Sequence, residues 1–467
     1  MIFSSLKFFV FFVVLLTLLI VIKNDRARRW LLALGSLFFY GAWNPAFLPL
    51  LVGNAVVGWA TGMLISDSAS IKSRKHYLWW ALFFFLGTLG YFKYALFFQD
   101  NLRWFFGIEE WAEWQIILPV GISFFTFQAI SYVIDVYRGD IKPCRNLFTF
   151  LIYIAFFPQL IAGPIVRANE FLPQLVRRIN IKRPNILIGL QIFGAGFLQK
   201  YLIADTLAFY VDPIFSNPEL YSPATLWLGL ISYTIQIFCD FSGYSLMAIG
   251  CARTLGFRLP ENFRMPYLSQ SITEFWRRWH MTLSRWLRDY LYVSLGGNRS
   301  GQRRTYVNLL LTMLLGGLWH GASWNFVLWG ALHGGALAIH RYWVSHRTGA
   351  SDKLTRRYRF FAWALTLLFV TLAWVPFRSA DFATTLVYMQ GLTFMQGGVD
   401  WLNGRAMIAI IVVVLWHYLA FRGVRGLFGL PSLRPFEPVP LLALSMTAMV
   451  VLLFGPDRTS PFIYFQF

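Results

Sequence analysis

The sequence has little charge and few cysteines for its length. Only 13% of its 467 residues are charged and 57% are hydrophobic, against about 25% charged residues in soluble globular proteins. This scarcity of charge excludes an ordinary soluble protein and indicates that lipid is the main solvent. The three cysteines, Cys144, Cys239 and Cys251, show no paired spacing. Neither a disulfide framework nor a metal site is therefore predicted.

Several catalytic motifs are also absent. The sequence contains no Ser-His-Asp order, no phosphate-binding glycine loop and no metal-ligand spacing. It has no internal repeat of the transporter type and no low-complexity tract. An enzyme with this sequence would therefore use histidine as its base and a donor that is already activated. A thioester is such a donor, because a thiolate is a good leaving group.

Acidic residues are scarce in comparison with basic ones. The chain has 21 Asp and Glu against 41 Lys and Arg, a net charge of +20. In a soluble protein this excess would suggest nucleic acid, but Lys and Arg also accumulate in the cytoplasmic loops of membrane proteins. We therefore expect membrane lipid, and no nucleic acid, as a partner. The predicted cytoplasmic stretches are residues 23–30, 72–75, 138–145, 167–183, 251–304, 341–359 and 422–434.

Apolar runs of membrane-spanning length recur along the whole chain. Together with the alternating loops they predict an all-α polytopic membrane protein, a single membrane-embedded domain over residues 1–467 with about 11–13 transmembrane helices. The run Phe8–Ile22 is interpreted as a retained first span, because it lacks a cleavage site and a basic cluster follows it. The predicted spans are 8–22, 30–51, 52–65, 78–98, 115–136, 184–209, 224–250, 305–320, 324–344, 360–377, 405–422 and 439–455.

One apolar segment, about 147–166, does not fit the alternation of sides. Both of its flanks are basic, and it contains Pro158 and the pair Gly163-Pro164, which would break a spanning helix. The segment is therefore predicted to be a re-entrant element that enters from the cytoplasm and returns. Irregular backbone persists at membrane depth only where protein buries it or where it lines a wet cavity. A cavity open to the cytoplasm is therefore predicted.

The basic region 251–304 is predicted to be helical and to lie at the cytoplasmic interface. Within Ser271–Val293, Thr273 is expected to cap an amphipathic helix that lies among the lipid headgroups. Four arginines in about three turns argue against a spanning helix. Its apolar residues at helical spacing are Phe275, Trp279, Leu283, Trp286, Leu287 and Tyr290, and the arginines between them are Arg277, Arg278, Arg285 and Arg288.

A histidine interrupts the hairpin predicted over residues 305–344. In "LLTMLLGGLWHGASWNFVLWG", His320 ends the first span, glycines flank it, and Ser323 and Asn325 follow at the tip. Glycine lets another backbone or a substrate approach closely. A polar side chain in lipid needs a partner or a function, so His320 is either hydrogen-bonded to a neighbouring helix or catalytic. The residues alone leave both interpretations open.

Two further polar residues have two interpretations each. His280, in "WRRWHMTLS", is either an interfacial histidine that faces headgroups or a group that meets an anionic donor beside the arginines. Asp240, in "IQIFCDFSGYS", is either a structural hydrogen-bonding residue or part of an ion pathway. The structural role is favoured for Asp240, and the other five histidines are interpreted as structural or solvated.

At these residues the sequence resembles the membrane-bound O-acyltransferases (MBOAT), and within them the bacterial branch that acetylates alginate. The resemblance covers most of the chain. It is carried by "LPVGISFFTFQAISYVIDVYRG", "FFPQLIAGPIVR", "QIFCDFSGYS", "LGFRLPENFRMPY", "SITEFWRRWHMTLSRWLRDYLYVSLGG", "GGLWHGASWNFVLWGALHG" and "PFIYFQF". The resemblance implies a ring of tilted helices in which a cytoplasmic pocket and an outer funnel meet through a central tunnel.

The same resemblance implies how the site works. His320 matches the family's essential histidine and is expected to be the catalytic base, and His280 matches a second histidine of this branch. The donor is expected to be acetyl-coenzyme A or another acetyl thioester from the cytoplasm, with no bound cofactor. A polysaccharide or a periplasmic partner acetyltransferase is expected to be the acceptor. Candidate substrate-binding residues are Trp319, Ser323, Asn325, Trp279, Arg277, Arg278 and Asp240.

The predicted function is therefore O-acetylation of an exopolysaccharide, alginate above others, by a multi-pass protein of the cell inner membrane. Within the family, acetylation of cellulose or another glycan and D-alanyl transfer to teichoic acid remain alternatives. A secondary transporter or lipid flippase is the alternative from a different class. It would couple ions through the intramembrane acids and would give His320 no special role.

Overall fold

The described part of the chain is built from helices. The computed structural model describes residues 3–108, 114–346, 355–393, 397–422, 455, 460 and 462–463, and within these residues the only β-type pairing is an isolated bridge between Tyr221 and Val399. The chain packs as two compact units, one of Met1–Phe193 with Met247–Pro260 and one of Gly194–Leu246 with Glu261–Phe467. The residues of two helices, α10 (Arg183–Leu198) and α12 (Pro223–Thr254), are divided between the two units.

The all-α polytopic membrane fold predicted from the sequence is confirmed. Six helical stretches among the described residues are long and apolar enough to cross a bilayer. Four more helices have 17 to 23 residues and are not among these six: α2 (Asp25–Gly41), α6 (Ile122–Arg138), α15 (Gly301–His320) and α16 (Trp324–His346). The six stretches are Pro45–Asp67, Ile71–Phe106, Arg183–Ser216, Pro223–Thr254, Arg356–Arg378 and Gly404–Phe421. The predicted total of spans and the ring with its tunnel stay predictions, and the span predicted at 439–455 lies outside the described residues.

The predicted boundary between the second and third spans is wrong. The second helix ends at Gly41 and the third extends over 20 residues, Leu48–Asp67, whereas the sequence suggested a break near residue 51. The cause is Pro45, which has no N–H to donate and disfavours helix in the residue before it. The side chain of Asn44 accepts a hydrogen bond from the Ala46 amide at 3.0 Å, and so starts the next helical turn.

The first unit packs its helices around α3, α6 and α7. Its interior contains aromatic and aliphatic side chains such as Phe125, Tyr132 and Phe150, all fully buried. Its elements are α1 (Leu6–Val21), α2 (Asp25–Gly41), η1 (Pro45–Phe47), α3 (Leu48–Asp67), α4 (Ile71–Leu89), η2 (Gly90–Tyr94), α5 (Ala95–Phe106), α6 (Ile122–Arg138), α7 (Leu147–Ala155), α8 (Phe157–Leu160), α9 (Ala168–Val176) and most of α10 (Arg183–Leu198).

The segment predicted to be re-entrant is a broken helix inside the first unit. The helix α7 stops at Ala155, and α8 contains Pro158 at its start. Side chains replace the missing helical hydrogen bonds, since the Gln159 amide donates to the Tyr153 carbonyl at 2.7 Å and the Tyr153 hydroxyl donates to the Val166 carbonyl at 3.0 Å. Residues 152–166 are all buried, as irregular backbone at membrane depth requires. Its path relative to the membrane stays a prediction.

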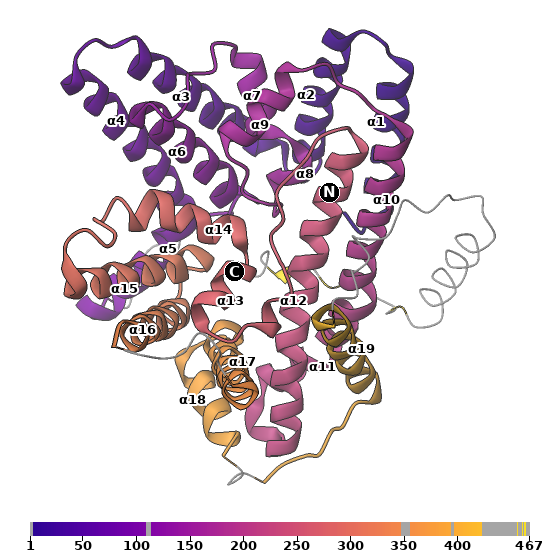
Figure 1. Ribbon diagram of the computed structural model, residues 1–467, viewed down its shortest axis with the longest axis vertical. Coiled ribbons are helices and arrows are strands. Elements are labelled where there is room, and N and C mark those ends of the chain that lie inside the picture. The colour runs from indigo at the N-terminus through magenta and orange to yellow at the C-terminus, as the bar shows by residue number, and fades with distance from the viewer. Residues whose placement is uncertain are drawn as a thin grey trace. The chain divides into compact units, whose positions relative to one another are not determined.

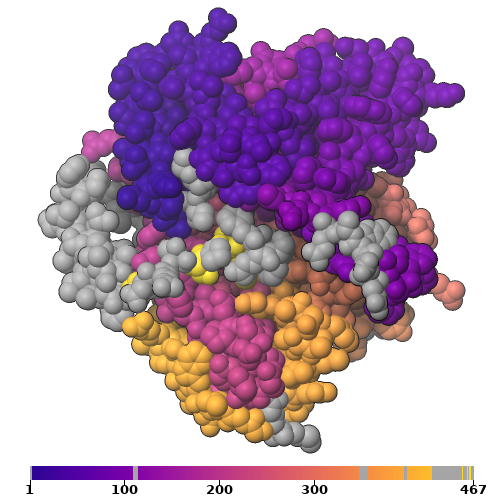
Figure 2. Space-filling view, turned by 180° about the vertical axis from the view of Figure 1, so that it is seen from behind, coloured from indigo at the N-terminus to yellow at the C-terminus, as the bar shows by residue number. Residues whose placement is uncertain are grey.

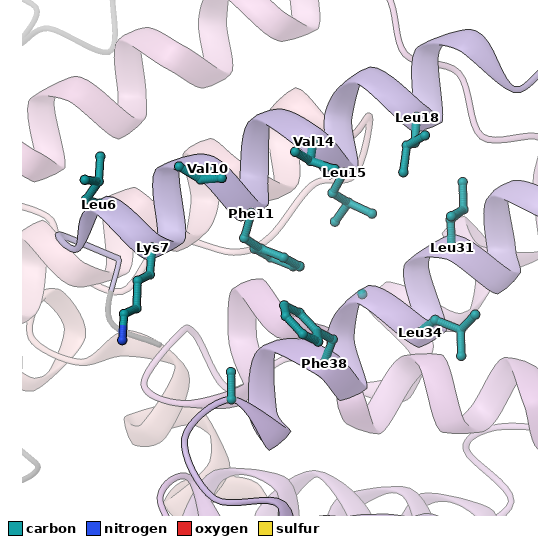
Figure 3. A pocket seen from close by; sticks show the side chains of 12 residues that line it. Leu6, Lys7, Val10, Phe11, Val14, Leu15, Leu18, Leu31, Leu34 and Phe38 are labelled. Atoms are coloured by element: carbon teal, nitrogen blue, oxygen red, sulfur yellow. The ribbon is translucent and has the colours of Figure 1, made fainter.

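An apolar groove of about 820 Å³ lies between α1 and α2 (Figure 3). Its walls are aliphatic and aromatic, with Phe11 and Phe38 opposite each other, and Lys7 is the one charged side chain among the described residues that line it. Several of these apolar side chains are exposed, among them Leu6 and Phe38. Such exposure suits a lipid-facing surface, because lipid tails are as apolar as the side chains.

The second unit contains the histidines singled out from the sequence. Within it, α11 lies between α18 and α19, as Figures 1 and 2 show from opposite sides. Its elements are η3 (Gln199–Ala204), α11 (Asp205–Ser216), η4 (Pro218–Leu220), most of α12 (Pro223–Thr254), η5 (Pro266–Leu268), α13 (Ile272–Arg278), α14 (Met281–Trp286), η6 (Leu287–Tyr292), α15 (Gly301–His320), α16 (Trp324–His346), α17 (Arg356–Arg378), α18 (Phe382–Gly391) and α19 (Gly404–Phe421).

Candidate active site

The hairpin of α15 and α16 places His320. The two helices pack directly against each other because glycines remove the side chains between them. A Cβ at Gly317 would lie 2.1 Å from the Phe326 carbonyl oxygen, and one at Gly330 would lie 2.3 Å from the Met313 carbonyl oxygen. No side chain fits in such a space. His320 is the last residue of α15, 3% exposed, and it therefore lies inside the unit at the tip of a tightly closed hairpin.

His280 lies in a sharp turn, and the continuous helix predicted over Ser271–Val293 is wrong. The chain forms α13, breaks at Trp279 and His280, and continues as α14 and η6. His280 has a φ of 39°, in the left-handed region that residues with a side chain seldom adopt. The turn directs its ring into the protein, where the residue is fully buried. An uninterrupted interfacial helix would have kept the histidine in register with its neighbours instead.

A remote asparagine holds this turn in place. The backbone oxygen of Asn262 accepts from the Met281 amide at 2.9 Å, and its side-chain oxygen accepts from the Thr282 amide at 3.3 Å and the Thr282 hydroxyl at 2.6 Å. The Asn262 amide donates to the Ser245 hydroxyl of α12 at 3.1 Å. These bonds offset the backbone strain at His280, because strained conformations persist only where their surroundings enforce them.

The first turn of α13 is capped by a different residue from the one predicted. The Ser271 hydroxyl accepts from the Glu274 amide at 3.2 Å, whereas Thr273 was expected to cap the helix. The Thr273 hydroxyl instead lies 2.9 Å from the His340 ring of α16. The cap therefore falls two residues earlier, and Thr273 is used to attach α13 to the hairpin.

The two histidine rings lie next to each other. The centroids of the His280 and His320 rings are 6.5 Å apart. Aromatic rings enclose the pair, with Trp319 at 6.0 Å from His280 and 5.1 Å from His320, and Trp329 at 5.0 Å from His320. On the other sides, Phe241 lies 4.6 Å from His280 and Phe377 lies 5.3 Å from His320. The site is therefore a pair of imidazoles inside a box of aromatic side chains.

The surroundings of His280 favour its neutral form. Neither ring nitrogen has a hydrogen-bond partner among the described residues, and burial lowers the pKa of His280 from 6.5 to about 3. Desolvation is the cause, since a buried cation loses its hydration without gaining a counter-charge. At neutral pH this imidazole has one N–H to donate and one nitrogen to accept.

Both tryptophans predicted at the site belong to the aromatic box or its wall. Trp319 contacts both histidine rings and is 4% exposed. Trp279, 1% exposed, lies behind His280 and packs on Phe275 and Trp374 at ring-centroid distances of 5.5 Å and 5.1 Å. Of these two tryptophans, Trp319 contacts the histidine pair directly and Trp279 supports the wall.

The polar residues of the hairpin tip stabilise the turn after His320. The Ser323 hydroxyl accepts from the Asn325 amide at 3.3 Å. The Asn325 side chain donates to the Ser379 carbonyl at 3.0 Å, which ties the start of α16 to the end of α17. Their predicted roles in substrate binding stay predictions, and each has a structural bond in this arrangement.

The two predicted donor-binding arginines differ in their partners. Arg278 lies 2.8 Å from the Glu274 carboxylate one turn earlier, whereas Arg277 is exposed on α13. Asp240, on α12, lies 2.5 Å from the Lys200 ammonium and accepts from the Ile463 amide at 2.8 Å. The structural interpretation of Asp240 thus has named partners, and the substrate-binding role of all three residues stays a prediction.

Sequence reasoning missed several residues that shape this region. Lys200 carries a signal that was overlooked, because a lysine within the apolar stretch "FLQKYLIAD" is a marker of function or pairing in a membrane span. Phe241, Trp329 and Phe377 carry no local signal, since an aromatic residue in an apolar run looks the same wherever it faces. Asn262 is also undetectable locally, because its partners lie 17 to 20 positions away.

Two neighbouring buried imidazoles in a multi-pass helical protein define a candidate membrane enzyme that works through histidine. The comparison with protein families agrees, since residues 144–377 match the membrane-bound O-acyltransferase family. The chain belongs to this family and is an O-acyltransferase. The matched residues include His280 and His320, whose individual catalytic roles stay predictions.

Three relatives indicate which members of the family are similar. The chain is 41% identical to a probable alginate O-acetylase, AlgI, of Pseudomonas putida over 100% of both chains. It is 42% identical to the corresponding protein of Pseudomonas aeruginosa over 92% of this chain and 83% of that protein. It is 37% identical to a peptidoglycan O-acetyltransferase of Helicobacter pylori over 80% of this chain and 75% of that protein. The expected family is thereby confirmed, and the transporter or flippase alternative is set aside.

Proposed function

We propose that the chain O-acetylates alginate at the cell inner membrane, with an acetyl thioester such as acetyl-coenzyme A as the donor from the cytoplasm. The similarity to probable alginate O-acetylases over nearly the whole chain supports the polymer and the acetyl group. The observation that carries the reaction is the buried imidazole pair, His280 and His320, with ring centroids 6.5 Å apart. The other glycans and D-alanyl transfer have less support, because the three relatives described above are named O-acetylases or O-acetyltransferases.

His320 is the general base in this proposal. Its ring takes the proton of an acceptor hydroxyl as the hydroxyl oxygen attacks the thioester carbonyl carbon. The C–S bond then breaks, and the thiolate leaves with the proton that His320 had accepted. General-base assistance of this kind contributes about 10²–10⁴-fold. The histidine is returned to its neutral form at the end of each cycle.

His280 is suited to a different role. Its lowered pKa of about 3 keeps the ring neutral, so it is a poor proton acceptor but still has one N–H to donate. In this proposal that N–H stabilises the negative charge that forms on the thioester oxygen. A donor placed in a water-poor site for this purpose is worth about 10²–10³-fold. In this proposal His280 therefore acts on the acetyl donor, and His320 acts on the acceptor hydroxyl.

In this proposal, substrates reach the pair when an aromatic side chain moves. The support is the burial of both histidines, since His280 is fully buried and His320 is 3% exposed. Phe377 and Trp329 lie 5.3 Å and 5.0 Å from His320 and are the nearest candidates to move on the acceptor side. Closure around the reacting groups excludes water, which would otherwise hydrolyse the thioester.

The acceptor is a hydroxyl group, and the molecule that carries it is the partner of this protein. The hydroxyl belongs either to the polymer or to a serine of a periplasmic acetyltransferase that completes the transfer. The chemistry at His320 is the same in both cases. Purified protein with labelled donor distinguishes them, because a direct transferase labels polymer alone, whereas a relay needs the partner protein and labels its serine first.

A peptidoglycan hydroxyl is a second candidate acceptor. The 37% identity to a peptidoglycan O-acetyltransferase supports a peptidoglycan hydroxyl as an alternative for the same site. Measuring the ester-bound acetyl of secreted polymer and of isolated peptidoglycan in one strain separates the two. Loss from the polymer alone in a His320 variant supports alginate as the acceptor, and loss from peptidoglycan alone overturns it.

The central experiment replaces His320 by alanine. The variant is expected to reach the membrane at wild-type level and to lose about 10²–10⁴-fold of its transfer activity, measured as acetyl ester content of the polymer. His346→Ala is the matched control, because His346 is an exposed histidine of the same hairpin and its loss should leave acetylation unchanged. Wild-type acetylation by the His320→Ala protein would contradict the assignment.

His280→Asn separates the two roles. If His280 serves the donor side, the variant loses activity toward every acceptor in equal proportion, including slow hydrolysis of the donor by water. If it serves the acceptor side, hydrolysis persists while transfer falls. Quantifying free thiol and acetyl ester in the same reaction gives both rates.

A further inference from the structure

An ion cluster is buried in the second unit, away from any solvated surface. The Lys200 ammonium of η3 lies 2.7 Å from the Asp205 carboxylate and 2.5 Å from the Asp240 carboxylate, and the three side chains are 2%, 0% and 4% exposed. One cation therefore faces two carboxylates. A buried charge needs further hydrogen bonds to offset its lost hydration, so the remaining donors and acceptors of this cluster must have partners.

Those partners come from the end of the chain. Lys200 donates to the Ser460 carbonyl at 3.1 Å, and the Ile463 amide donates to the second oxygen of Asp240 at 2.8 Å. Both are backbone groups, more than 200 positions away in the sequence. Three charged side chains from η3, α11 and α12 thus form a cluster that holds the backbone at Ser460 and Ile463.

The held segment continues into the wall of the histidine pair. Phe462 packs on Tyr244 at 4.5 Å and lies 5.8 Å from Phe241. Phe241 lies 4.6 Å from the His280 ring and directly follows Asp240 in α12. A path of contacts therefore leads from the ion cluster through Ile463, Phe462 and Phe241 to His280.

We propose that Lys200, Asp205 and Asp240 form an ion clamp that positions Ser460, Phe462 and Ile463 against the wall of the His280 site. The clamp residues are positioning residues, since none of them touches the histidines. A buried charge cluster suits this task because its hydrogen bonds are directional and costly to leave unmade, whereas apolar packing alone lets a short terminal segment slide. The effect of the clamp on catalysis rests on the proposed function. The existence of the clamp does not.

Hydrogen exchange tests the clamp without reference to activity. Full-length protein in lipid nanodiscs is compared as wild type and Asp240→Asn. Lys200 and Ile463 contact different oxygens of the Asp240 carboxylate, and the variant places an NH₂ group, which cannot accept, at one of these two positions. The C-terminal peptide that contains Ile463 is expected to exchange at least about tenfold faster, the equivalent of one lost charge-assisted hydrogen bond.

Two further variants keep the test decisive. Asp212→Asn is the control, because it removes a carboxylate of the same unit that pairs with Arg378 at 2.6 Å and has no part in the clamp; exchange of the C-terminal peptide should not change. Ile463→Pro removes the donating amide and leaves the buried charges intact, and it covers the case in which Asp240→Asn does not fold. Unchanged exchange elsewhere in the terminal peptide of Ile463→Pro would overturn the clamp.

Activity then tests the consequence. Asp240→Asn and a chain that stops at residue 459 are expected to lower kcat to a similar level, with KM for the donor unchanged. The two changes combined should lower it no further, because they act through the same segment. Faster exchange with wild-type kcat would overturn the link to His280. Absence of acyl transfer in the wild type would refute the proposed function and leave the exchange result to decide the clamp.

Discussion

The two histidines of the site are held in opposite ways. His320 ends a regular helix, and its position follows from glycine contacts between two neighbours in the sequence, α15 and α16. His280 lies in a left-handed turn that Asn262 of a separate segment fixes. One imidazole is therefore placed by local geometry and the other by long-range hydrogen bonds. The difference predicts that the two can be displaced independently, and that they will fail for different reasons.

The largest effect is expected from a substitution that forces α15 and α16 apart. Gly317→Val places side-chain atoms where the Phe326 carbonyl lies 2.1 Å from the Cβ position, so the helices must separate. Overpacking of this kind costs up to about 3 kcal/mol and occasionally more, and His320 should lose its place and its activity. Denaturation with SDS followed by circular dichroism measures the stability.

Gly335→Ala is the control for that change. A Cβ at Gly335 has no atom within 4 Å, and alanine is the better helix former by up to about 1 kcal/mol. Stability should stay equal or rise. A hairpin that tolerates Gly317→Val as well as Gly335→Ala would show that backbone contact does not place His320.

The next effect in size concerns the turn at His280. Asn262→Ala removes an acceptor of two hydrogen bonds and a donor of one, and leaves Ser245 and Thr282 without these partners. Unpaired buried polar groups cost about 1–3 kcal/mol each, so a loss of about 3 kcal/mol is expected. Acetyl transfer should fall while His320 keeps its place. A lower kcat with the near-UV circular dichroism of the wild type would distinguish this outcome from global unfolding.

A smaller effect is expected from pH. Burial lowers the pKa of His280 from 6.5 to about 3, so the unfolded chain binds its proton first as the pH falls below 6.5. Stability is therefore complete above pH 6.5 and is lost progressively toward pH 3. Between pH 6.5 and 5 the loss from this residue is about 2 kcal/mol. His280→Gln should lack that part of the slope, and identical slopes in the two proteins would contradict it.

The smallest effect isolates the backbone strain. His280→Gly and His280→Ala both lack the imidazole, but only glycine adopts a φ of 39° without steric cost. His280→Gly is expected to be more stable than His280→Ala by about 1 kcal/mol. Both should be inactive to the same degree. Equal stability would mean that the left-handed turn is not retained when the ring is removed.

Local patterns predicted the parts of the fold that local physics determines. Pro158 broke the apolar run at the expected place, because a proline cannot donate within a helix. The arginine-rich region is amphipathic, with Phe275 buried and Arg277 exposed, and its place at the membrane interface stays a prediction. The prediction of a continuous helix failed at Trp279 and His280, because the apolar residues keep helical spacing on both sides of the break. Apolar periodicity records burial, and a turn that keeps its residues buried leaves the periodicity intact.

By itself the sequence determined that this is a membrane protein, which segments are apolar helices, and that a histidine ends the first helix of the hairpin. Each of these features depends on residues within a few helical turns of one another. Only the tertiary structure decided that His280 turns inward to lie 6.5 Å from His320, and that Lys200 and Asp240 hold the backbone near residue 463. These arrangements join residues from 40 to more than 200 positions apart. No local preference encodes such pairings, since they form only when packing brings the partners together and excludes the water that would otherwise satisfy them.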